Sequence, residues 1–295
     1  MTKAPTKQWL PSFLVLSFVW GFSFLFIKIS LEALTPVQVA FYRIGLGALT
    51  LFLILLVKRH RFVATKDVIA LSAVAGLINN AIPFTLISCA EQRIPSALAG
   101  ILNATTPLFT LIFAAVFLID ERFDRKQAAG LFFSFLGVIV VLAPWNGAGG
   151  SLIGSLAVVT AAMLYGISSV FIRRNISGKL PIMEQAAWQL LFGALWLVPF
   201  QRSIPQNVPL KVVGSILTIG IFGSAIANVL INYLFVNAGA IIASSVTYLI
   251  PVVSTIAGVL ILSECLTSNE IFGAVMVIIG LVASGRKRST TSQKG

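Results

Sequence analysis

The fold is decided by a stretch that the sequence contains twice. The first copy, residues 96–143, reads SALAGILNATTPLFTLIFAAVFLIDERFDRKQAAGLFFSFLGVIVVLA, and the second, residues 240–283, reads AIIASSVTYLIPVVSTIAGVLILSECLTSNEIFGAVMVIIGLVA. Each copy has a proline inside an apolar run, then a glutamate, then two glycines: Pro107, Glu121, Gly130 and Gly137 in one, and Pro251, Glu264, Gly273 and Gly280 in the other. Each copy therefore predicts two long apolar helices joined by a short charged turn. A duplicated helix pair is typical of membrane transporters built from repeats.

The composition places the whole chain in a lipid bilayer. Of its 295 residues, 58% are hydrophobic and only 10% are charged, whereas a soluble domain has roughly 25% charged residues. The net charge of +12 is therefore interpreted as loop charge that sets the orientation of the chain. A nucleic-acid partner is not expected.

The sequence carries little that could support enzymatic chemistry. The two cysteines, Cys89 and Cys265, are far apart, and the one histidine, His60, lies in a basic run where we expect a solvated loop residue. These residues predict no disulfide framework, metal site or catalytic triad. A phosphate-binding G-x-x-x-x-G-K-[ST] motif is also missing. We therefore expect no enzyme, no cofactor and no ATPase subunit, with the bilayer and a small-molecule substrate as partners; homo-oligomers stay open.

Ten apolar runs are long enough to cross a bilayer, which needs about 20 residues. They are residues 10–29, 37–57, 68–89, 96–119, 127–144, 152–172, 183–200, 212–235, 240–262 and 270–285. The uncharged, glycine-rich residues 146–151 fall almost at the midpoint and form the best candidate for a linker. The sequence thus predicts an all-α membrane protein with a first repeat at residues 1–148 and a second at 149–295.

The two predicted repeats have opposite orientations. Gly21 and Gly166 are 145 positions apart, as are Pro36 and Pro181, so the duplication extends to the first spans of each half. Each predicted half has five spans. Because five is an odd number, the second half must enter the membrane from the side opposite to the first. Counting Lys and Arg in the connections gives sixteen on the side of the two termini and four on the other side. Both termini are therefore predicted in the cytoplasm.

Polar residues inside the predicted spans are the candidates for function, because a polar side chain in lipid costs free energy unless it faces protein or water. Arg43 is the strongest of them, since a central arginine costs at least ~2.5 kcal/mol on insertion scales. It either reaches a nearby carbonyl or the interface, or it borders a cavity and meets an anionic group of a substrate. Gln189 holds the matching position in the second half.

The remaining candidates are amides and aromatic residues in or near spans. The amides Asn79, Asn80, Asn228 and Asn232 either bond neighbouring helices or line a cavity shared by spans three and eight. Asn103 and Tyr248 stand just before prolines, where broken helices are tolerated beside a cavity. The full set of predicted cavity residues is Trp20, Ser23, Tyr42, Arg43, Asn79, Asn80, Phe84, Asn103, Tyr165, Trp188, Gln189, Asn228, Asn232 and Tyr248.

Two features receive structural interpretations. Gly130 and Gly137 are seven positions apart and share one helix face, as Gly273 and Gly280 do, so backbones can approach closely there. Glu121 and Glu264 are expected to cap the starts of spans five and ten. Among the acids, Glu91 alone comes near a cavity, at the end of a span, and no acid is placed at mid-membrane.

These motifs resemble the EamA family of the drug/metabolite transporter superfamily. The likeness covers about residues 10–285 and depends on the Trp20-Gly21 pair and on the duplicated Pro–Glu–Gly–Gly element. It implies a ten-helix bundle with a central cavity, a place in the bacterial inner membrane, and efflux of amino acids or related metabolites. Small four-span relatives exchange drugs for protons through a glutamate in the first helix. Here that run carries Trp20, Ser23 and no acid, which fits facilitated export better.

The functional hypothesis is a secondary transporter or facilitator that exports small amphipathic metabolites, above all amino acids, by alternating access. Export of cationic or aromatic drugs is the alternative within transport. A membrane-embedded enzyme acting on lipid-linked substrates is disfavoured, because paired acids and metal ligands are missing.

Overall fold

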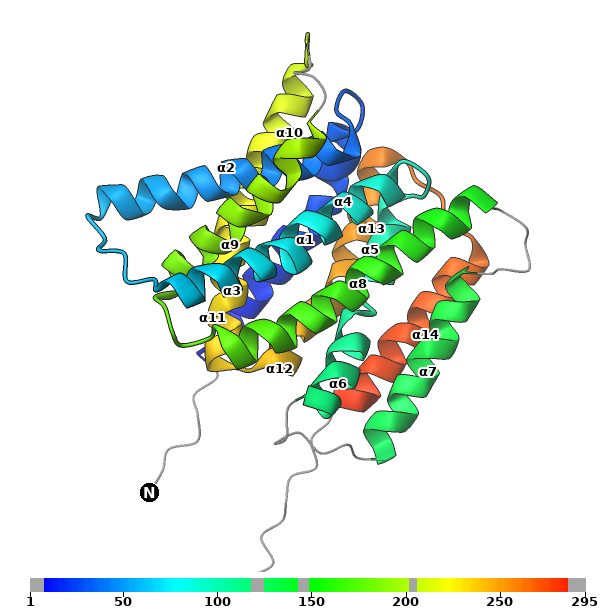
Figure 1. Cartoon of the computed structure of the whole chain (residues 1–295). Helices are drawn as coiled ribbons and strands as arrows, with labels where there is room; N and C mark the ends of the chain where they lie inside the picture. Colours follow the sequence, from blue (N-terminus) through cyan, green and yellow to red (C-terminus); the bar gives the residue numbers. More distant parts are fainter. Residues whose placement is uncertain (1–7, 118–124, 143–148, 202–205, 286–295) are drawn as a thin grey trace, which may run out of the picture.

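The computed structural model describes residues 8–117, 125–142, 149–201 and 206–285, and every regular element in these ranges is a helix. Figure 1 shows the arrangement. In chain order the elements are α1 (Leu10–Ser30), α2 (Pro36–Val57), α3 (Lys66–Gly76), η1 (Leu77–Ala81), α4 (Ile82–Glu91), α5 (Ser96–Asn103), α6 (Thr106–Phe117), α7 (Arg125–Leu142), α8 (Gly149–Asn175), α9 (Ile182–Leu197), η3 (Val198–Phe200), α10 (Leu210–Gly220), η4 (Ile221–Ile226), α11 (Ala227–Asn237), α12 (Ala240–Ser244), η5 (Ser245–Tyr248), α13 (Ile250–Leu262) and α14 (Ser268–Gly285).

Seven stretches among the described residues are long and apolar enough to cross a membrane. They are Leu10–Ser30, Pro36–Val57, Lys66–Glu91, Ser96–Phe117, Leu152–Asn175, Leu210–Asn237 and Ala240–Leu262. Three further apolar helices, α7, α9 and α14, are 18, 16 and 18 residues long and match the other expected runs. The all-helical membrane fold is confirmed, while the count of ten spans and the cytoplasmic placement of the termini stay predictions.

Several spans are interrupted at matching places in the two halves. The span at Lys66–Glu91 contains the π-helix η1, and the span at Leu210–Asn237 contains the π-helix η4. The span at Ser96–Phe117 breaks between α5 and α6, just before Pro107. The span at Ala240–Leu262 breaks at the 3₁₀-helix η5, just before Pro251. π-bulges and broken helices of this kind often mark functional sites.

Helices of the first half pack on helices of the second. α2 lies against α9, α5 against α13, and α4 and α6 against α8. α7 and α14 stand together at one side of the bundle, in the lower right of Figure 1. A Cβ on Gly137 would come within 2.9 Å of the Gly273 carbonyl oxygen, and one on Gly280 within 2.5 Å of the Gly130 carbonyl oxygen. The prediction that these glycines permit close backbone approach is confirmed.

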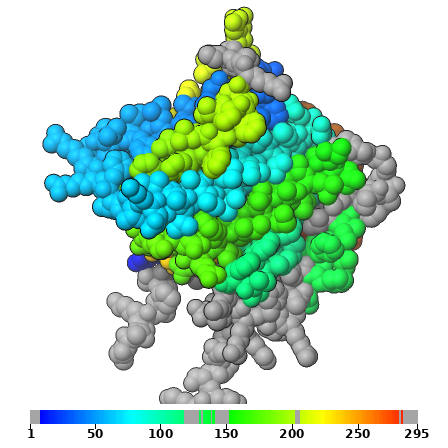
Figure 2. Space-filling view, viewed as in Figure 1, coloured from blue at the N-terminus to red at the C-terminus, as the bar shows by residue number. Residues whose placement is uncertain are grey.

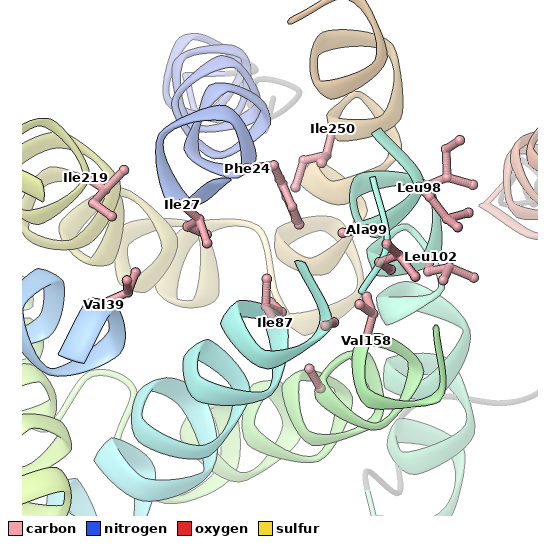
Figure 3. Close-up of a cluster of buried hydrophobic side chains, with 14 of the residues drawn as sticks. Phe24, Ile27, Val39, Ile87, Leu98, Ala99, Leu102, Val158, Ile219 and Ile250 are labelled. Atoms are coloured by element: carbon pink, nitrogen blue, oxygen red, sulfur yellow. The ribbon is translucent and has the colours of Figure 1, made fainter. Parts of the chain in front are cut away.

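The outside of the bundle is apolar, as expected of a surface in contact with lipid. Large exposed hydrophobic side chains include Phe18, Leu53, Phe132 and Phe272. In Figure 2 the side chains of α3, α8 and α9 lie side by side over the face in view. Inside, a cluster of buried hydrophobic residues joins α1, α4, α5 and α13, and Figure 3 shows Phe24, Ile27, Ile87 and Ile250 pointing toward one another within it.

Two carboxylates, Glu264 and Glu184, contact distant parts of the chain in ways that the sequence did not predict. Glu264 accepts hydrogen bonds from the backbone N–H groups of Ser96 (2.7 Å) and Ala97 (3.0 Å). It therefore caps α5, which begins span four, so the expectation that it caps span ten is wrong. His60 is also no freely solvated residue, because its Nε2 lies 2.9 Å from the buried Glu184 carboxylate.

Some sequence predictions fall outside the described ranges. Glu121 is one of them, and both ends of the chain, residues 1–7 and 286–295, are others. Of the predicted linker, residues 146–148 also lie outside, whereas residues 149–151 belong to α8.

Candidate functional site

A central cavity lies between the two halves of the chain. Its wall comes from α1, α2, η1, α4, α5, α6, α8, α11, α12, η5 and α13. The lining residues are Trp20, Ser23, Phe24, Ile27, Arg43, Asn79, Phe84, Ile87, Asn103, Thr106, Tyr165, Ser169, Ile231, Phe235, Ala243, Ser244, Thr247 and Ile250.

Arg43 supplies the charge of the cavity wall. Its side chain is only 2% exposed, and its Nε donates to Ser224 Oγ at 3.3 Å while Nη2 donates to the Gly223 carbonyl oxygen at 3.4 Å. The guanidinium carbon lies 3.8 Å from the centre of the Phe84 ring. Arg43 thus bonds a backbone carbonyl and also lines the cavity, while its contact with an anionic group of a substrate stays a prediction.

The π-helix η4 explains why this arginine is held. A π-helix has i→i+5 backbone hydrogen bonds in place of the i→i+4 bonds of an α-helix. The Gly223 carbonyl oxygen accepts from Arg43 and also from the indole Nε1 of Trp20 at 3.3 Å. A Cβ on residue 223 would come within 2.8 Å of Ser23 Oγ, so glycine allows α1 to approach η4 closely. Three predicted cavity residues are thus gathered around one glycine.

The break between α5 and α6 adds polar groups to the same wall. Proline lacks an N–H group, so Pro107 leaves the Asn103 carbonyl oxygen without its helical donor. Thr106 Oγ1 donates to that oxygen at 2.8 Å. Asn103 Oδ1 is buried and has no hydrogen-bond partner among the described residues, so this acceptor is available to a ligand. In the other half, Thr247 Oγ1 donates to the Ser244 carbonyl oxygen at 2.9 Å.

The structure brings half of the predicted residues together around the cavity. The seven that line it are Trp20, Ser23, Arg43, Asn79, Phe84, Asn103 and Tyr165. The seven that lie elsewhere are Tyr42, Asn80, Trp188, Gln189, Asn228, Asn232 and Tyr248.

Among the latter, the amides form a buried layer between α9 and α11. The Gln185 side chain donates to Asn232 Oδ1, and Asn232 Nδ2 donates to Gln189 Oε1 at 3.2 Å. Asn228 Nδ2 donates to the Ser224 carbonyl oxygen at 2.9 Å within its own span. Asn80 is fully buried where η1 packs on α9. Asn232 thus joins α11 to α9, as the helix-bonding interpretation expects, whereas Asn228 bonds only its own span and both polar side-chain atoms of Asn80 lack a partner among the described residues.

The remaining aromatic candidates have packing environments of their own. Trp188 contacts the rings of Phe52, Phe62 and Phe192 and donates weakly to Glu184 at 3.4 Å. Tyr42 is half-buried against Phe41 and the main core cluster. Tyr248 is half-buried against a small cluster that includes Leu108 and Val277.

Eleven lining residues are not in the predicted set of cavity residues. Thr106 and Thr247 had a signal, because each stands close before a span-breaking proline. The others are Phe24, Ile27, Ile87, Ser169, Ile231, Phe235, Ala243, Ser244 and Ile250. Nothing in the sequence separates these mostly apolar residues from the apolar residues that face lipid.

The side chains of the cavity wall are suited to binding a small molecule. Among the described residues that line it, Arg43 is the one that carries a charge, and the rest are aromatic, aliphatic, hydroxyl or amide groups. Such a wall can hold an apolar or aromatic body beside one anionic group.

Comparison with known proteins identifies the family. The model of the EamA-like transporter family matches residues 7–143 and again residues 152–286. The chain belongs to the EamA-like transporter family. The family expected from the sequence is thereby confirmed, and the protein is a transporter.

Relatives of this EamA-like protein carry matching descriptions. An "Uncharacterized transporter" of Archaeoglobus fulgidus is 29% identical over 96% of this chain and 100% of its own length. The "Uncharacterized inner membrane transporter YedA" of Escherichia coli K12 is 27% identical over 93% and 92%. "Uncharacterized transporter YcxC" of Bacillus subtilis is 30% identical over 91% and 89%. The protein is thus a multi-pass protein of the inner membrane, as predicted.

The fold also matches a solved protein. A crystal structure covering 94% of this chain and 96% of its own superimposes with a TM-score of 0.69 at 19% sequence identity. At that identity the likeness concerns the fold alone.

Proposed function

We propose that this transporter exports small amphipathic metabolites, with amino acids as the substrate class, by alternating access. The single observation that carries the proposal is the composition of the cavity wall, in which the charge of Arg43 stands among aromatic and aliphatic side chains. A free amino acid has a carboxylate for the guanidinium and an aliphatic or aromatic side chain for the rest of the wall. A carboxylate held by arginine forms one of the stronger hydrogen bonds in proteins.

The alternating-access part of the proposal is supported by the arrangement of the two halves. The family model matches one segment in each half, and the cavity lies between them with interrupted spans on both sides. In transporters built from inverted repeats, rocking of one repeat against the other exposes such a site to each side in turn. The halves at residues 1–148 and 149–295 would be the moving units.

Aromatic cations are the rival substrates, because Trp20, Phe84 and Tyr165 offer ring faces that attract cations. The buried charge of Arg43 opposes them, since like charges in a low-dielectric cavity repel strongly. The two classes therefore predict opposite results in one assay.

The test is counterflow in proteoliposomes. Vesicles preloaded with unlabelled L-leucine, L-phenylalanine or tetraphenylphosphonium are offered the same compound in labelled form, with protein-free vesicles as the blank. We expect accumulation of the two amino acids and none of the cation. The cavity variant Asn103→Ala should raise the half-saturating concentration, whereas Tyr42→Phe, outside the wall, should leave it unchanged. Accumulation of the cation alone would overturn the proposed substrate class.

A further inference from the structure

Glu91 is a buried acid that lies outside the wall of the central cavity. It is the last residue of α4, its side chain is fully buried (0% exposed), and it is not part of the cavity wall. Both carboxyl oxygens lie without a hydrogen-bond partner among the described residues. An ionised carboxylate in such a place costs several kcal/mol, and a group of this kind becomes neutral by taking up a proton.

The nearest cation does not neutralise Glu91 by direct pairing. Lys28 Nζ donates to the backbone carbonyl oxygens of Glu91 and of Ile94, the latter at 3.1 Å. In the described part of the chain no ion pair within 4.0 Å joins the ammonium to the Glu91 carboxyl group. The ammonium group is thus held by two backbone carbonyls, which leaves the acid unpaired.

The other charged groups around Glu91 come from several elements. Glu264, after α13, repels a negative charge there, whereas Arg43 on α2 attracts it. α8 presents Tyr165, which interacts with Arg43, and η1 and α5 carry no titratable side chain. Arg93, two residues along the chain, is exposed. The surrounding charges therefore partly favour and partly oppose a negative charge on Glu91. Its two carboxyl oxygens have no hydrogen-bond donor among the described residues.

The position of Glu91 connects it with the cavity. Ile87, one helical turn earlier on α4, lines the cavity, and Ile27, next to Lys28, does so on α1. Glu91 and Lys28 thus close the bundle one turn beyond the cavity wall. Opening of this end would let water reach the acid, which would then ionise.

We propose that Glu91 is a proton-binding site that links closure of this end of the bundle to the uptake of one proton. On closure a carboxylate oxygen takes up a proton from hydronium in the buffered solution on that side, which leaves water, and on opening the acid returns the proton to the same solution. No other group changes charge. The part of the inference that concerns transport rests on the proposed function, because it joins the proton to alternating access.

Infrared spectroscopy of the protein in lipid tests the site without any substrate. A protonated carboxylic acid has a C=O stretch that a carboxylate lacks. At neutral pH we expect the wild type to show the C=O band of a protonated carboxylic acid. This band should disappear in Glu91→Gln and persist in Glu32→Gln, because Glu32 is an exposed acid paired with Lys211. Glu91→Leu gives a second comparison, because apolar replacement of a buried charged group is often tolerated. Equal spectra for wild type and both Glu91 variants would overturn the proposal.

L-leucine counterflow then tests the linkage. One linked proton changes the ratio of closed to open states by up to about tenfold per pH unit, so the wild-type rate should depend on pH. Glu91→Gln should keep counterflow and lose that dependence, whereas Glu32→Gln should behave as the wild type. Counterflow with no acid band would refute the proton site. An acid band with no counterflow of any probe would refute the proposed function and leave the proton site standing.

Discussion

Replacing Arg43 by glutamine is the sharpest test of the cavity. Glutamine stands at the matching position of the second half, Gln189, so the residue is compatible with this fold. In Arg43→Gln the amide nitrogen takes about the place of the arginine Nε and can still donate one hydrogen bond to Ser224 Oγ. The variant loses the positive charge and the contact with the Phe84 ring at 3.8 Å.

The size of the effect follows from the bond that is lost. A hydrogen bond to a charged group contributes about 1.5–3 kcal/mol, and about 1.4 kcal/mol corresponds to a tenfold change in affinity. Arg43→Gln should therefore raise the half-saturating concentration of L-leucine roughly tenfold to 150-fold. L-Leucinamide has no carboxylate, so its half-saturating concentration should change little or fall.

The assay is counterflow over a range of concentrations, with both compounds and both proteins in matched vesicles. Unchanged affinity of Arg43→Gln for L-leucine would refute the assignment of Arg43 as the carboxylate partner. Equal losses for L-leucine and L-leucinamide would show that the arginine maintains the shape of the cavity and does not bind the carboxylate.

Three further predictions concern packing, capping and the ring beneath the guanidinium. Gly76→Ala places a Cβ within 2.6 Å of the backbone of α9. It should lower the free energy of unfolding by about 1–3 kcal/mol, as measured by thermal unfolding. The control Gly45→Ala, whose Cβ would have nothing within 4 Å, should not lower the free energy of unfolding. Glu264→Ala removes the acceptor of two backbone N–H groups at the start of α5 and should cost about 1–3 kcal/mol. Glu270→Ala, which removes a bond to Thr267 N at the start of its own helix, should cost no more than about 1 kcal/mol; equal losses would contradict this ranking. Phe84→Leu removes a desolvated cation–π contact of about 2 kcal/mol and should weaken L-leucine binding in counterflow, though less than loss of the guanidinium does; unchanged binding would count against a role for the ring.

The cavity shows where sequence reasoning reaches its limit. Asn79 and Asn80 are neighbours with the same chemistry, yet Asn79 lines the cavity while Asn80 is buried against α9. The π-turn at η1 changes the direction of side chains along this span, and a sequence pattern based on the α-helical period does not contain that change. The same holds for η4, whose Gly223 carbonyl oxygen accepts hydrogen bonds from both Arg43 and Trp20.

Glu91 marks a second limit. The sequence places it near a cavity at the end of a span, and nothing in the sequence predicts its complete burial. Its complete burial arises because α1, α2, α5 and α8 pack on α4, and these contacts join residues far apart along the chain. Glu264 was likewise assigned to the wrong helix, since its capping partner Ser96 is 168 positions away.

The sequence by itself determined the membrane class, the positions of the helices, the breaks before Pro107 and Pro251, and the close glycine contacts of α7 and α14. These features depend on composition and on spacing along one or two helices, which a sequence displays directly. The tertiary structure alone decided which polar groups face the cavity and which join helices. In a bilayer both the buried and the lipid-facing sides of a helix are apolar, so hydrophobic periodicity does not mark the inward side.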